Sequence, residues 1–522
     1  MSCVELMSQW SFLIFTLWGS LFLLQTTVLL HRLWLRPRWL QWALRAQGLR
    51  GKPYRLLTTV DGPSGCRKTS MPLRCHDIAP FVVPLLHNAV QEHGRTCLSS
   101  WFGPMPKVTV VDARLTREVM SGKSGHLEKF RRFPMLSRLL AAGLPTYEGE
   151  KWARHRRIIS PAFHLEKLKI MLPAFYSCCQ DLIARWTESL CNSEGWGEID
   201  VYPEFQSLAV DAISCTAFGS SYLEGKRILE LQAEQADRVS AGVKTIFIPG
   251  YLYLPTKNNR RMRQIDNEIE SILQGIIGRR MQAMREGKLM KDDLLGLMLE
   301  SNMREPDVVN GRSARGMSIE EVMEECKMFY FAGIGVPSTL LTWTIVLLSM
   351  HPEWQDRARE EVLAQFGKNQ PDYDGLSSLR TVTMILYEVL RLYPPAIAFI
   401  RKTCKETTIG GIRYPAGVVI EMPVLLIHHD PDIWGEDVHE FRPERFAEGI
   451  SKASNDPGVF LPFGWGPRAC IGKNFALLEA KMAVCMILQH FEFELAPTYI
   501  HAPHNKTLHP MHGAHINLRA LV

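Results

Sequence analysis

The first apolar run of the chain extends from Trp10 to Leu30 and contains no charged residue. With a rise of about 1.5 Å per residue, these ~21 residues can cross a bilayer as one helix. The sequence therefore predicts a single-pass, uncleaved anchor over residues 1–31. A cleaved signal peptide would carry basic residues before the run and a small-residue cleavage site after it, and the sequence has neither.

Basic residues follow this run and none precedes it, which indicates the orientation of the anchor. The positive-inside rule places the N-terminus on the lumenal side and the rest of the chain in the cytoplasm. Trp34, Trp39 and Trp42 lie among the basic residues and favour a helix on the membrane surface. Gly48 to Gly65 is rich in Gly and Pro and indicates a linker. We therefore expect a basic interfacial segment and linker over 32–65 and one globular domain over 66–522. The basic residues are Arg32, Arg36, Arg38, Arg45, Arg50, Lys52 and Arg55.

Beyond the linker the apolar positions mostly follow a helical period, with few extended runs. Two of these, 97–102 and 107–111, flank Gly103-Pro104-Met105-Pro106 and predict a hairpin, and 418–422 predicts another strand. Ser318 and Glu321 form a capping-box pattern, and the apolar run after them reaches Met350. That is one helix of ~32 residues, or about 48 Å. The predicted fold class is mainly α with a smaller β region.

Composition narrows the function only a little. Hydrophobic residues make up 46% and charged residues 22%, as in ordinary globular proteins. The formal charge of +6 is small and scattered, so nucleic acid is not an expected partner. The twelve cysteines are dispersed without metal-like spacing, which indicates a reduced chain without a disulfide framework.

One cysteine has an unusual setting, in a glycine-rich loop from Phe463 to Gly472 just before an apolar helix pattern. An arbitrary cysteine is usually a small core residue. Here Gly464, Gly466 and Gly472 allow a tight turn that brings the Cys470 sulfur close to a flat ring. The start of the following helix adds a positive dipole end near that sulfur. These features favour a thiolate that serves as axial ligand to haem iron.

Two other motifs suit the same kind of site. Trp152 and Arg156 lie four residues apart on one helix face, where an indole N–H and a guanidinium can hold a carboxylate. Glu388 and Arg391 form a Glu-x-x-Arg pair with apolar flanks, which indicates a buried ion pair. A buried pair needs further partners to offset desolvation, and Arg445 is the candidate.

The string Phe463-x-x-Gly466-x-Arg468-x-Cys470-x-Gly472 resembles the haem-thiolate signature of the cytochromes P450. The order of Trp-x-x-x-Arg, long helix, Glu-x-x-Arg, Pro443-Glu444-Arg445-Phe446 and the cysteine loop is also that of the family. The resemblance covers nearly everything after the anchor. Shorter strings, such as 147–150, 161–164 and 474–481, are similar to the plant seventy-two clan.

The resemblance implies a P450 fold that holds haem b (iron-protoporphyrin IX), with Cys470 as the axial iron ligand. It also implies that Trp152, Arg156, Arg401 and Arg468 hold the haem propionates, with Phe463 beside the sulfur. The structural residues are Glu388, Arg391 and Arg445. The resemblance further implies that electrons come from NADPH through a membrane-bound cytochrome P450 reductase at the endoplasmic reticulum. The expected activity is oxidation of a hydrophobic plant isoprenoid such as a triterpenoid or a gibberellin-like compound.

The long helix departs from the family pattern. Monooxygenases of the family usually carry an acid and an alcohol there, which relay protons to bound dioxygen. Without a gap in the alignment, Gly335 replaces the acid and Val336 the alcohol. Ser338 and Thr339 are nearby hydroxyls and the candidate catalytic residues, and Pro337 favours a kink.

Three interpretations follow from this departure. In the first, Ser338, Thr339, ordered water or a substrate hydroxyl substitutes and the protein is a monooxygenase. In the second, it rearranges hydroperoxides without NADPH. In the third, it is a weakly active, haem-bearing binding protein.

Overall fold

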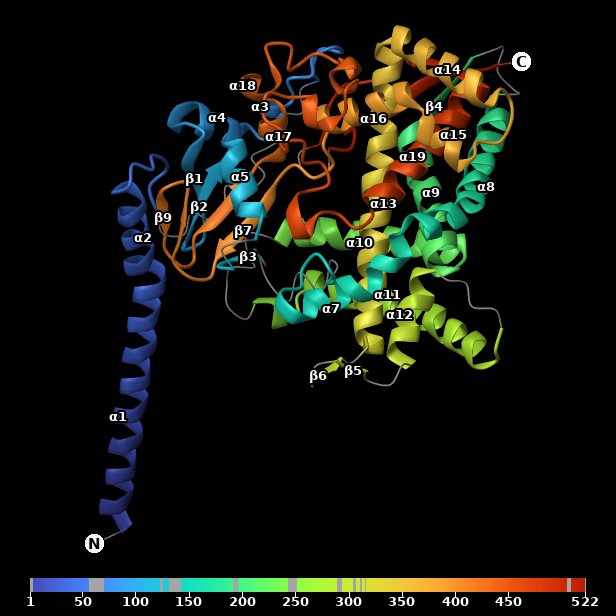
Figure 1. Cartoon of the computed structure of the whole chain (residues 1–522). Coiled ribbons are helices and arrows are strands. Elements are labelled where there is room, and N and C mark those ends of the chain that lie inside the picture. Colours follow the sequence, from blue (N-terminus) through green and yellow to red (C-terminus); the bar gives the residue numbers. More distant parts are fainter. Residues whose placement is uncertain are drawn as a thin grey trace.

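The computed structural model shows one long helix that projects from a mostly helical body with a sheet along one side (Figure 1). The structure describes residues 3–55, 70–122, 125–130, 142–190, 196–242, 251–288, 293–303, 307–309, 312–314, 316–504 and 508–521.

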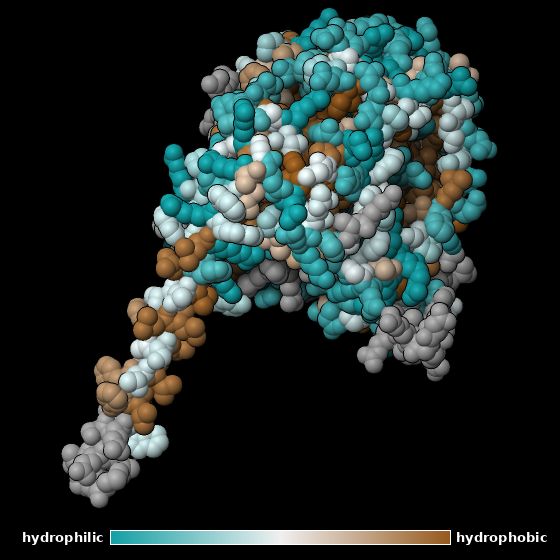
Figure 2. Space-filling view, turned by 60° about the vertical axis from the view of Figure 1, so that its left-hand side comes forward, coloured by the Kyte–Doolittle hydropathy of each residue, from teal (hydrophilic) through white to brown (hydrophobic). Residues whose placement is uncertain are grey.

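The projecting helix is the predicted anchor. α1 (Cys3–Leu30) continues through a π-helical turn (His31–Leu35) into α2 (Arg36–Arg45). The side chains of Trp10 and of residues 12–30 are exposed, and apolar groups cover this stretch in Figure 2. Phe12–Arg45 and Ile319–Met350 are the two helices of the described part that are long and apolar enough to cross a membrane. The second is largely buried within the protein, whereas no part of the apolar window of the first is buried.

α2 attaches the anchor to the body. Leu40 and Leu44 are buried, because this helix packs against a strand of the main sheet. Trp39 and Trp42, on the same helix, remain exposed. The helix therefore has a docked apolar side and a free aromatic side, as an interfacial helix requires. Of the predicted linker, the part beyond Arg55 lies outside the described residues.

The main sheet has five strands in the order β1-β2-β10-β7-β3. The predicted hairpin is confirmed, since β1 and β2 pair antiparallel with Phe102 opposite Met105. The turn is shorter than the sequence indicated, because only Gly103 and Pro104 lie between the strands. The bounds are β1 Thr96–Phe102, β2 Met105–Val110, β3 Leu127–Lys129, β7 Phe399–Thr403 and β10 Val419–Met422.

Smaller sheets complete the β region. A three-stranded sheet has the order β11-β12-β4, and two short hairpins are formed by β5 with β6 and by β8 with β9. Their bounds are β4 Gly197–Asp200, β5 Asp307–Val309, β6 Arg312–Ala314, β8 Thr407–Ile409, β9 Ile412–Tyr414, β11 Phe491–Leu495 and β12 His515–Ala520.

Helices form the rest of the body. They are α3 Ala79–Val82, α4 Pro84–His93, α5 Ala113–Met120, α7 Gly149–Ile159, α8 Leu165–Leu190, α9 Val201–Ile213, α10 Tyr222–Gly242, α11 Lys257–Arg285, α12 Leu294–Met303, α13 Ile319–Met350, α14 Pro352–Phe366, α15 Tyr373–Ser378, α16 Arg380–Leu392, α17 Val424–His428, α18 Pro431–Trp434 and α19 Lys473–His490. The nine cysteines whose side chains the structure describes are all free thiols.

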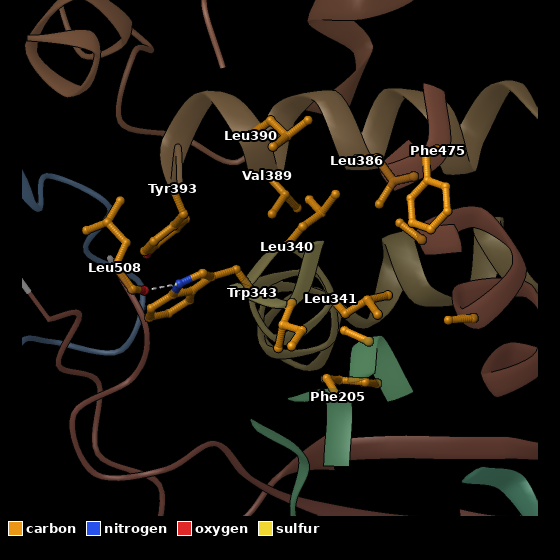
Figure 3. Close-up of a cluster of buried hydrophobic side chains, with 14 of the residues drawn as sticks. Phe205, Leu340, Leu341, Trp343, Leu386, Val389, Leu390, Tyr393, Phe475 and Leu508 are labelled. Atoms are coloured by element: carbon orange, nitrogen blue, oxygen red, sulfur yellow. Dashed lines mark hydrogen bonds between the residues drawn. The ribbon is translucent and has the colours of Figure 1, made fainter. Parts of the chain in front are cut away.

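α13 is the central helix, and its predicted start and end are confirmed. Ser318 and Glu321 form the capping box, with N–H to side-chain distances of 3.1 and 3.2 Å. The C-terminal half is buried on all sides between α16, α19 and α9. Figure 3 shows Trp343 of this helix stacked on Tyr393 while its indole N–H donates to the carbonyl of Leu508. This packing fixes the helix that borders the functional site.

The predicted ion pair is fully buried. Arg391 donates to both carboxylate oxygens of Glu388, at 2.7 and 2.8 Å, and neither side chain is exposed. Arg391 also donates to the carbonyls of His428 and Val438. The Arg445 Nε lies 3.8 Å from Glu388, within ion-pair distance but too far for a hydrogen bond. The pair thus joins α16 to the chain between α17 and the cysteine loop.

We expect Arg391→Ala to prevent accumulation of soluble folded protein. The substitution leaves the Glu388 carboxylate buried without its charge partner, which costs about 3–5 kcal/mol. The measurement is soluble yield and unfolding temperature in detergent. Lys452→Ala is the control, because Lys452 and Glu448 form an exposed pair worth under about 1 kcal/mol. Equal yield and stability of the two variants would contradict the structural role of the pair.

We expect a chain without residues 1–31 to lose carbonate-resistant membrane association and keep its fold. The span contributes no buried side chain to the described body, and the exposed face of α2 retains only weak, salt-sensitive binding. Sedimentation after alkaline carbonate extraction tests this. A truncated chain that resists extraction, or that no longer folds, would show that the anchor lies elsewhere or that α1 belongs to the core.

Candidate functional site

The cysteine loop is held in a tight path by two glycines. Gly464 has φ +73° and Gly466 has φ +71°, which L side chains rarely adopt. A Cβ on Gly466 would lie 2.8 Å from the carbonyl oxygen of Met120. The N–H of Cys470 donates to the carbonyl of Phe463 at 2.8 Å and closes the loop. Gly472 has φ −88°, and a Cβ there would meet no protein atom closer than 3.9 Å, so its role in the close approach to a flat ring stays a prediction.

Cys470 faces the interior of a cavity. The accessible surface of Cys470 opens into this deep cavity rather than onto the outside of the protein. Burial nevertheless raises the pKa of its thiol. The N–H groups of Gly472 and Lys473 and the charges of Arg156 and Lys129 oppose that rise of the pKa. The predicted helix begins at Lys473, so its first N–H groups point toward the sulfur. These N–H groups and cations would help to stabilise a thiolate if a metal ion offset the cost of its burial.

The cavity lies between the cysteine loop and α13. It contains about 1220 Å³ of space free of atoms, including its open mouth. Phe463 and Phe399 line it near the loop, and Phe163 and Ile213 line it elsewhere. α13 contributes Met328, Phe329, Ala332, Gly333, Val336 and Pro337. The wall is mostly apolar, so the cavity suits a hydrophobic molecule.

One edge of the cavity carries an excess of positive charge. Lys129, Arg156 and Arg468 line it, and Arg401 lies close enough to Lys129 and Arg468 to influence both. Glu148 is the carboxylate among them, with one oxygen accepting from the N–H of Lys129 at 2.8 Å and the other paired with Arg468. Burial, with Arg401 and Arg468, lowers the pKa of Lys129 to about 7. Such a group of cations favours an anionic ligand.

The predicted propionate ligands are brought together by three elements. α7 carries Trp152 and Arg156 on the face that lines the cavity. Arg156 donates to the carbonyl of Ala469 at 3.1 Å. The Arg468 guanidinium stacks on the Trp152 ring at 4.0 Å and donates to the carbonyl of Tyr147. Arg401, in β7, lies opposite Lys129 of β3.

These residues fit a haem group. A buried sulfur faces an apolar cavity, and the cations along one edge outnumber the carboxylates. A flat apolar ring with two carboxylates and an iron that binds thiolate matches each of these features. The two propionates would balance the charges of Arg156, Arg401 and Arg468 that Glu148 leaves uncompensated.

α13 passes the cavity with Gly335 and Val336 at the two positions where P450 monooxygenases usually carry an acid and an alcohol. Val336 lines the cavity with hydrocarbon only. The hydroxyl of Ser338 donates to the carbonyl of Ile334 at 2.7 Å, and that of Thr339 donates to the carbonyl of Gly335 at 2.8 Å. Both side chains are buried, and neither belongs to the cavity lining. The catalytic role of these two hydroxyls stays a prediction.

Sequence reasoning missed three polar residues of the site. Lys129 and Glu148 belong to the charged edge described above. Glu325 lines the cavity from α13, where it accepts from the N–H of Leu144 at 3.0 Å and contacts the Nδ1 of His155 at 2.7 Å. His155 and Glu325 are fully buried. A histidine within the Trp-x-x-x-Arg helix and a glutamate on a largely apolar helix were the available signals.

Comparison with known proteins agrees with this site. The family model described as Cytochrome P450 matches residues 83–514. Cytochrome P450 CYP72A616 of Paris polyphylla is 54% identical over 94% of this chain and 95% of its own length. Cytochrome P450 72A13 of Arabidopsis thaliana is 48% identical over the same shares of the two chains. Secologanin synthase 2 of Catharanthus roseus is 45% identical over 94% of this chain and 93% of its own.

The family match spans most of the globular body, from the helices beside the main sheet to the residue before the last strand, and includes the cysteine loop. The matches to these relatives cover 94% of this chain. This chain therefore belongs to the cytochrome P450 family, as a haem-dependent monooxygenase of the plant seventy-two clan.

Proposed function

We propose that this P450 monooxygenase oxidises a hydrophobic plant isoprenoid, either a triterpenoid or a gibberellin-like compound. The main support for this proposal is the mostly apolar cavity that extends from Cys470 along α13. In the overall reaction, a substrate C–H bond and dioxygen, with two electrons and two protons, give C–OH and water. NADPH provides the electrons through a cytochrome P450 reductase.

Cys470 is the proposed axial ligand of the haem iron. The backbone around it positions the sulfur, since the Cys470 N–H is held by Phe463 and the first N–H groups of α19 point at the sulfur. When bound, thiolate-ligated haem supplies the reductive activation of dioxygen and the oxidation of an unactivated C–H bond. Phe463 is proposed to exclude water from the sulfur side of the ring, because it lines the cavity beside the loop.

Arg156, Arg401, Arg468 and Trp152 are proposed to hold the two propionates. Guanidinium groups pair with carboxylates through two parallel hydrogen bonds, and the indole N–H adds a single donor. Arg156 and Arg468 are already oriented by backbone carbonyls of Ala469 and Tyr147. Little side-chain entropy is lost when such preoriented groups bind.

The substrate class rests on the cavity wall and on the clan. Phe163, Phe329 and Ile213 provide large apolar contacts, and the carboxylate of Glu325 is a polar group in the same wall. A wall of this kind suits a fused hydrocarbon skeleton with few oxygen groups. One relative bears the name secologanin synthase, and the resemblance to the clan implies isoprenoids among the possible substrates.

Proton delivery is proposed to use ordered water or a substrate hydroxyl, with Ser338 and Thr339 as further candidates. Pro337 has no N–H, so the carbonyl of Gly333 receives no hydrogen bond from position 337. Gly333 lines the cavity, and its carbonyl is a suitable acceptor for a water molecule there. Ser338 or Thr339 would have to turn away from the backbone carbonyl that each now contacts.

Membrane attachment and electron supply complete the proposal. The apolar α1 is proposed to cross the endoplasmic reticulum membrane, with the haem domain on the cytoplasmic side. The basic residues that follow α1 support that orientation. A reductase anchored in the same membrane can then reach the haem domain.

We expect Cys470→Ala to abolish the haem-thiolate absorption of the reduced, carbon monoxide-bound protein. Alanine removes the only group in this loop that can bind iron as a thiolate. Cys404→Ala is the matched control, because Cys404 is exposed and its thiol contacts only the carbonyl of His126 among the described residues. A haem-thiolate spectrum that survives in Cys470→Ala would disprove the ligand assignment.

The double substitution Gly335→Asp with Val336→Thr tests whether the usual relay is needed. A Cβ on Gly335 meets no atom within 4 Å, so an acid fits there. We expect product formed per NADPH consumed to change by less than about tenfold, whereas a missing acid–base group typically costs about 10²–10⁴. Gly335→Asn with Val336→Thr is the control of equal shape without the acid.

A gain of about a hundredfold in the acid-bearing variant alone would contradict the substitute relay. It would mean that the natural chain consumes NADPH without making product. Turnover of fatty-acid hydroperoxides without NADPH would then favour the hydroperoxide-rearranging reaction. Substrate binding with no turnover under either condition would favour a haem-bearing binding protein.

A further inference from the structure

Three side chains with metal-binding atoms meet far from the haem cavity. Asp77 precedes α3, His429 follows α17, and His439 lies in the turn before Pro443–Phe446. One ligand atom from each lies within 4.8 Å of the others. α3, α17 and α18 lie together at the top of the body in Figure 1. Segments separated by more than three hundred residues thus contribute to one cluster.

His429 is oriented as metal-binding histidines are. Its side chain is almost completely buried, at 6% exposure. The Nε2 atom lies 2.9 Å from the carbonyl of Leu392, and a carbonyl can only accept, so this nitrogen carries the proton. The Nδ1 atom is left with a lone pair and has no hydrogen-bond partner. Metal-binding histidines commonly donate their other ring N–H to a backbone carbonyl in this way.

The other two groups complete the cluster. The Nδ1 atom of His439 is also buried and has no hydrogen-bond partner. It lies 4.0 Å from a carboxylate oxygen of Asp77, which is beyond hydrogen-bond distance. The side chains of His439 and Asp77 are 40% and 42% exposed, so water and ions can reach the cluster and both side chains can move.

Burial is the main reason why both imidazoles favour the neutral form. Burial lowers the pKa of His429 well below its usual value, and Arg391 lowers it further. Burial also lowers the pKa of His439, with Asp77 opposing and with Arg391 and His87 adding to the effect. The positive charge of Arg391 is offset by Glu388, which it contacts through two hydrogen bonds.

We propose that Asp77, His429 and His439 form a binding site for one divalent transition-metal ion, zinc(II) in particular. Two imidazole nitrogens and one carboxylate suit zinc, whereas magnesium and calcium prefer oxygen ligands alone. Water supplies the fourth ligand. In a tetrahedral zinc site the ligand atoms are roughly 3.3 Å apart, so Asp77 and His439 close by about 1 Å when the ion binds.

The ion would stabilise residues 428–439, the segment that the buried Glu388–Arg391 pair also contacts. Arg391 donates to the carbonyls of His428 and Val438, which are the neighbours of His429 and His439 in the sequence. Asp77 adds a link from this segment to the start of α3. Zinc binding therefore stabilises the folded haem domain, because a ligand that binds only the folded state raises its stability.

The test uses the full-length holoenzyme in detergent, freed of metals by a chelator and dialysed against zinc. Zinc per haem and the unfolding temperature are measured for the natural chain, His439→Ala and Asp77→Asn. His515→Ala is the matched control, because His515 and Glu198 form a similar pair, at 34% and 38% exposure. Haem content and the carbon monoxide spectrum establish that each variant is folded.

Because the proposal is for one site, the natural chain and the control should each retain about one additional zinc ion per haem compared with His439→Ala and Asp77→Asn. Zinc should raise the unfolding temperature of the first two proteins only. Equal zinc retention in all four proteins, or equal thermal shifts, would overturn the proposal.

A second measurement does not depend on variants. X-ray absorption at the zinc edge of the natural chain should show two imidazoles with oxygen ligands and no sulfur. Sulfur ligation would place the ion at a cysteine instead, and failure of the natural chain to retain zinc would equally overturn the site.

Discussion

A single cysteine sulfur has to face an apolar cavity while the backbone around it stays tight, and the rest of the site depends on that constraint. The left-handed conformations of Gly464 and Gly466 turn the loop, and the N–H of Cys470 closes it onto Phe463. α19 then presents its first N–H groups to the sulfur. α13 covers the opposite side of the cavity, and its buried C-terminal half keeps that wall in place.

Charged side chains occur in two different settings, one at the edge of the cavity and one in the interior of the fold. At its edge, cations from α7, β3, β7 and the cysteine loop exceed the carboxylate of Glu148, and the haem propionates would restore the balance. Deeper in the fold, Arg391 and Glu388 pair with each other and leave no charge uncompensated. Unpaired buried charge is strongly unfavourable. The first set therefore favours cofactor binding, whereas the second holds the chain that leads to the cysteine loop.

Much of the fold and the site could be predicted because each motif occupies one contiguous stretch. The capping box of Ser318, the Trp152–Arg156 face and the cysteine loop depend on local spacing alone. Lys129, Glu148 and Glu325 were missed because long-range packing brings them to the cavity. The directions of the Ser338 and Thr339 hydroxyls also depend on local competition, since each can donate to the carbonyl four residues before it. The role of Gly472 stays a prediction, because neither its φ nor the protein atoms around it require glycine.

P450 monooxygenation by this chain has to proceed although Gly335 and Val336 replace the usual acid and alcohol. The most direct measurement supplies membranes that contain the protein and a P450 reductase with isotopically labelled dioxygen and a panel of triterpenoids and gibberellins. We expect a hydroxylated product that contains the label only when NADPH is present. Consumption of NADPH with release of peroxide, and no labelled product from any member of the panel, would contradict this expectation.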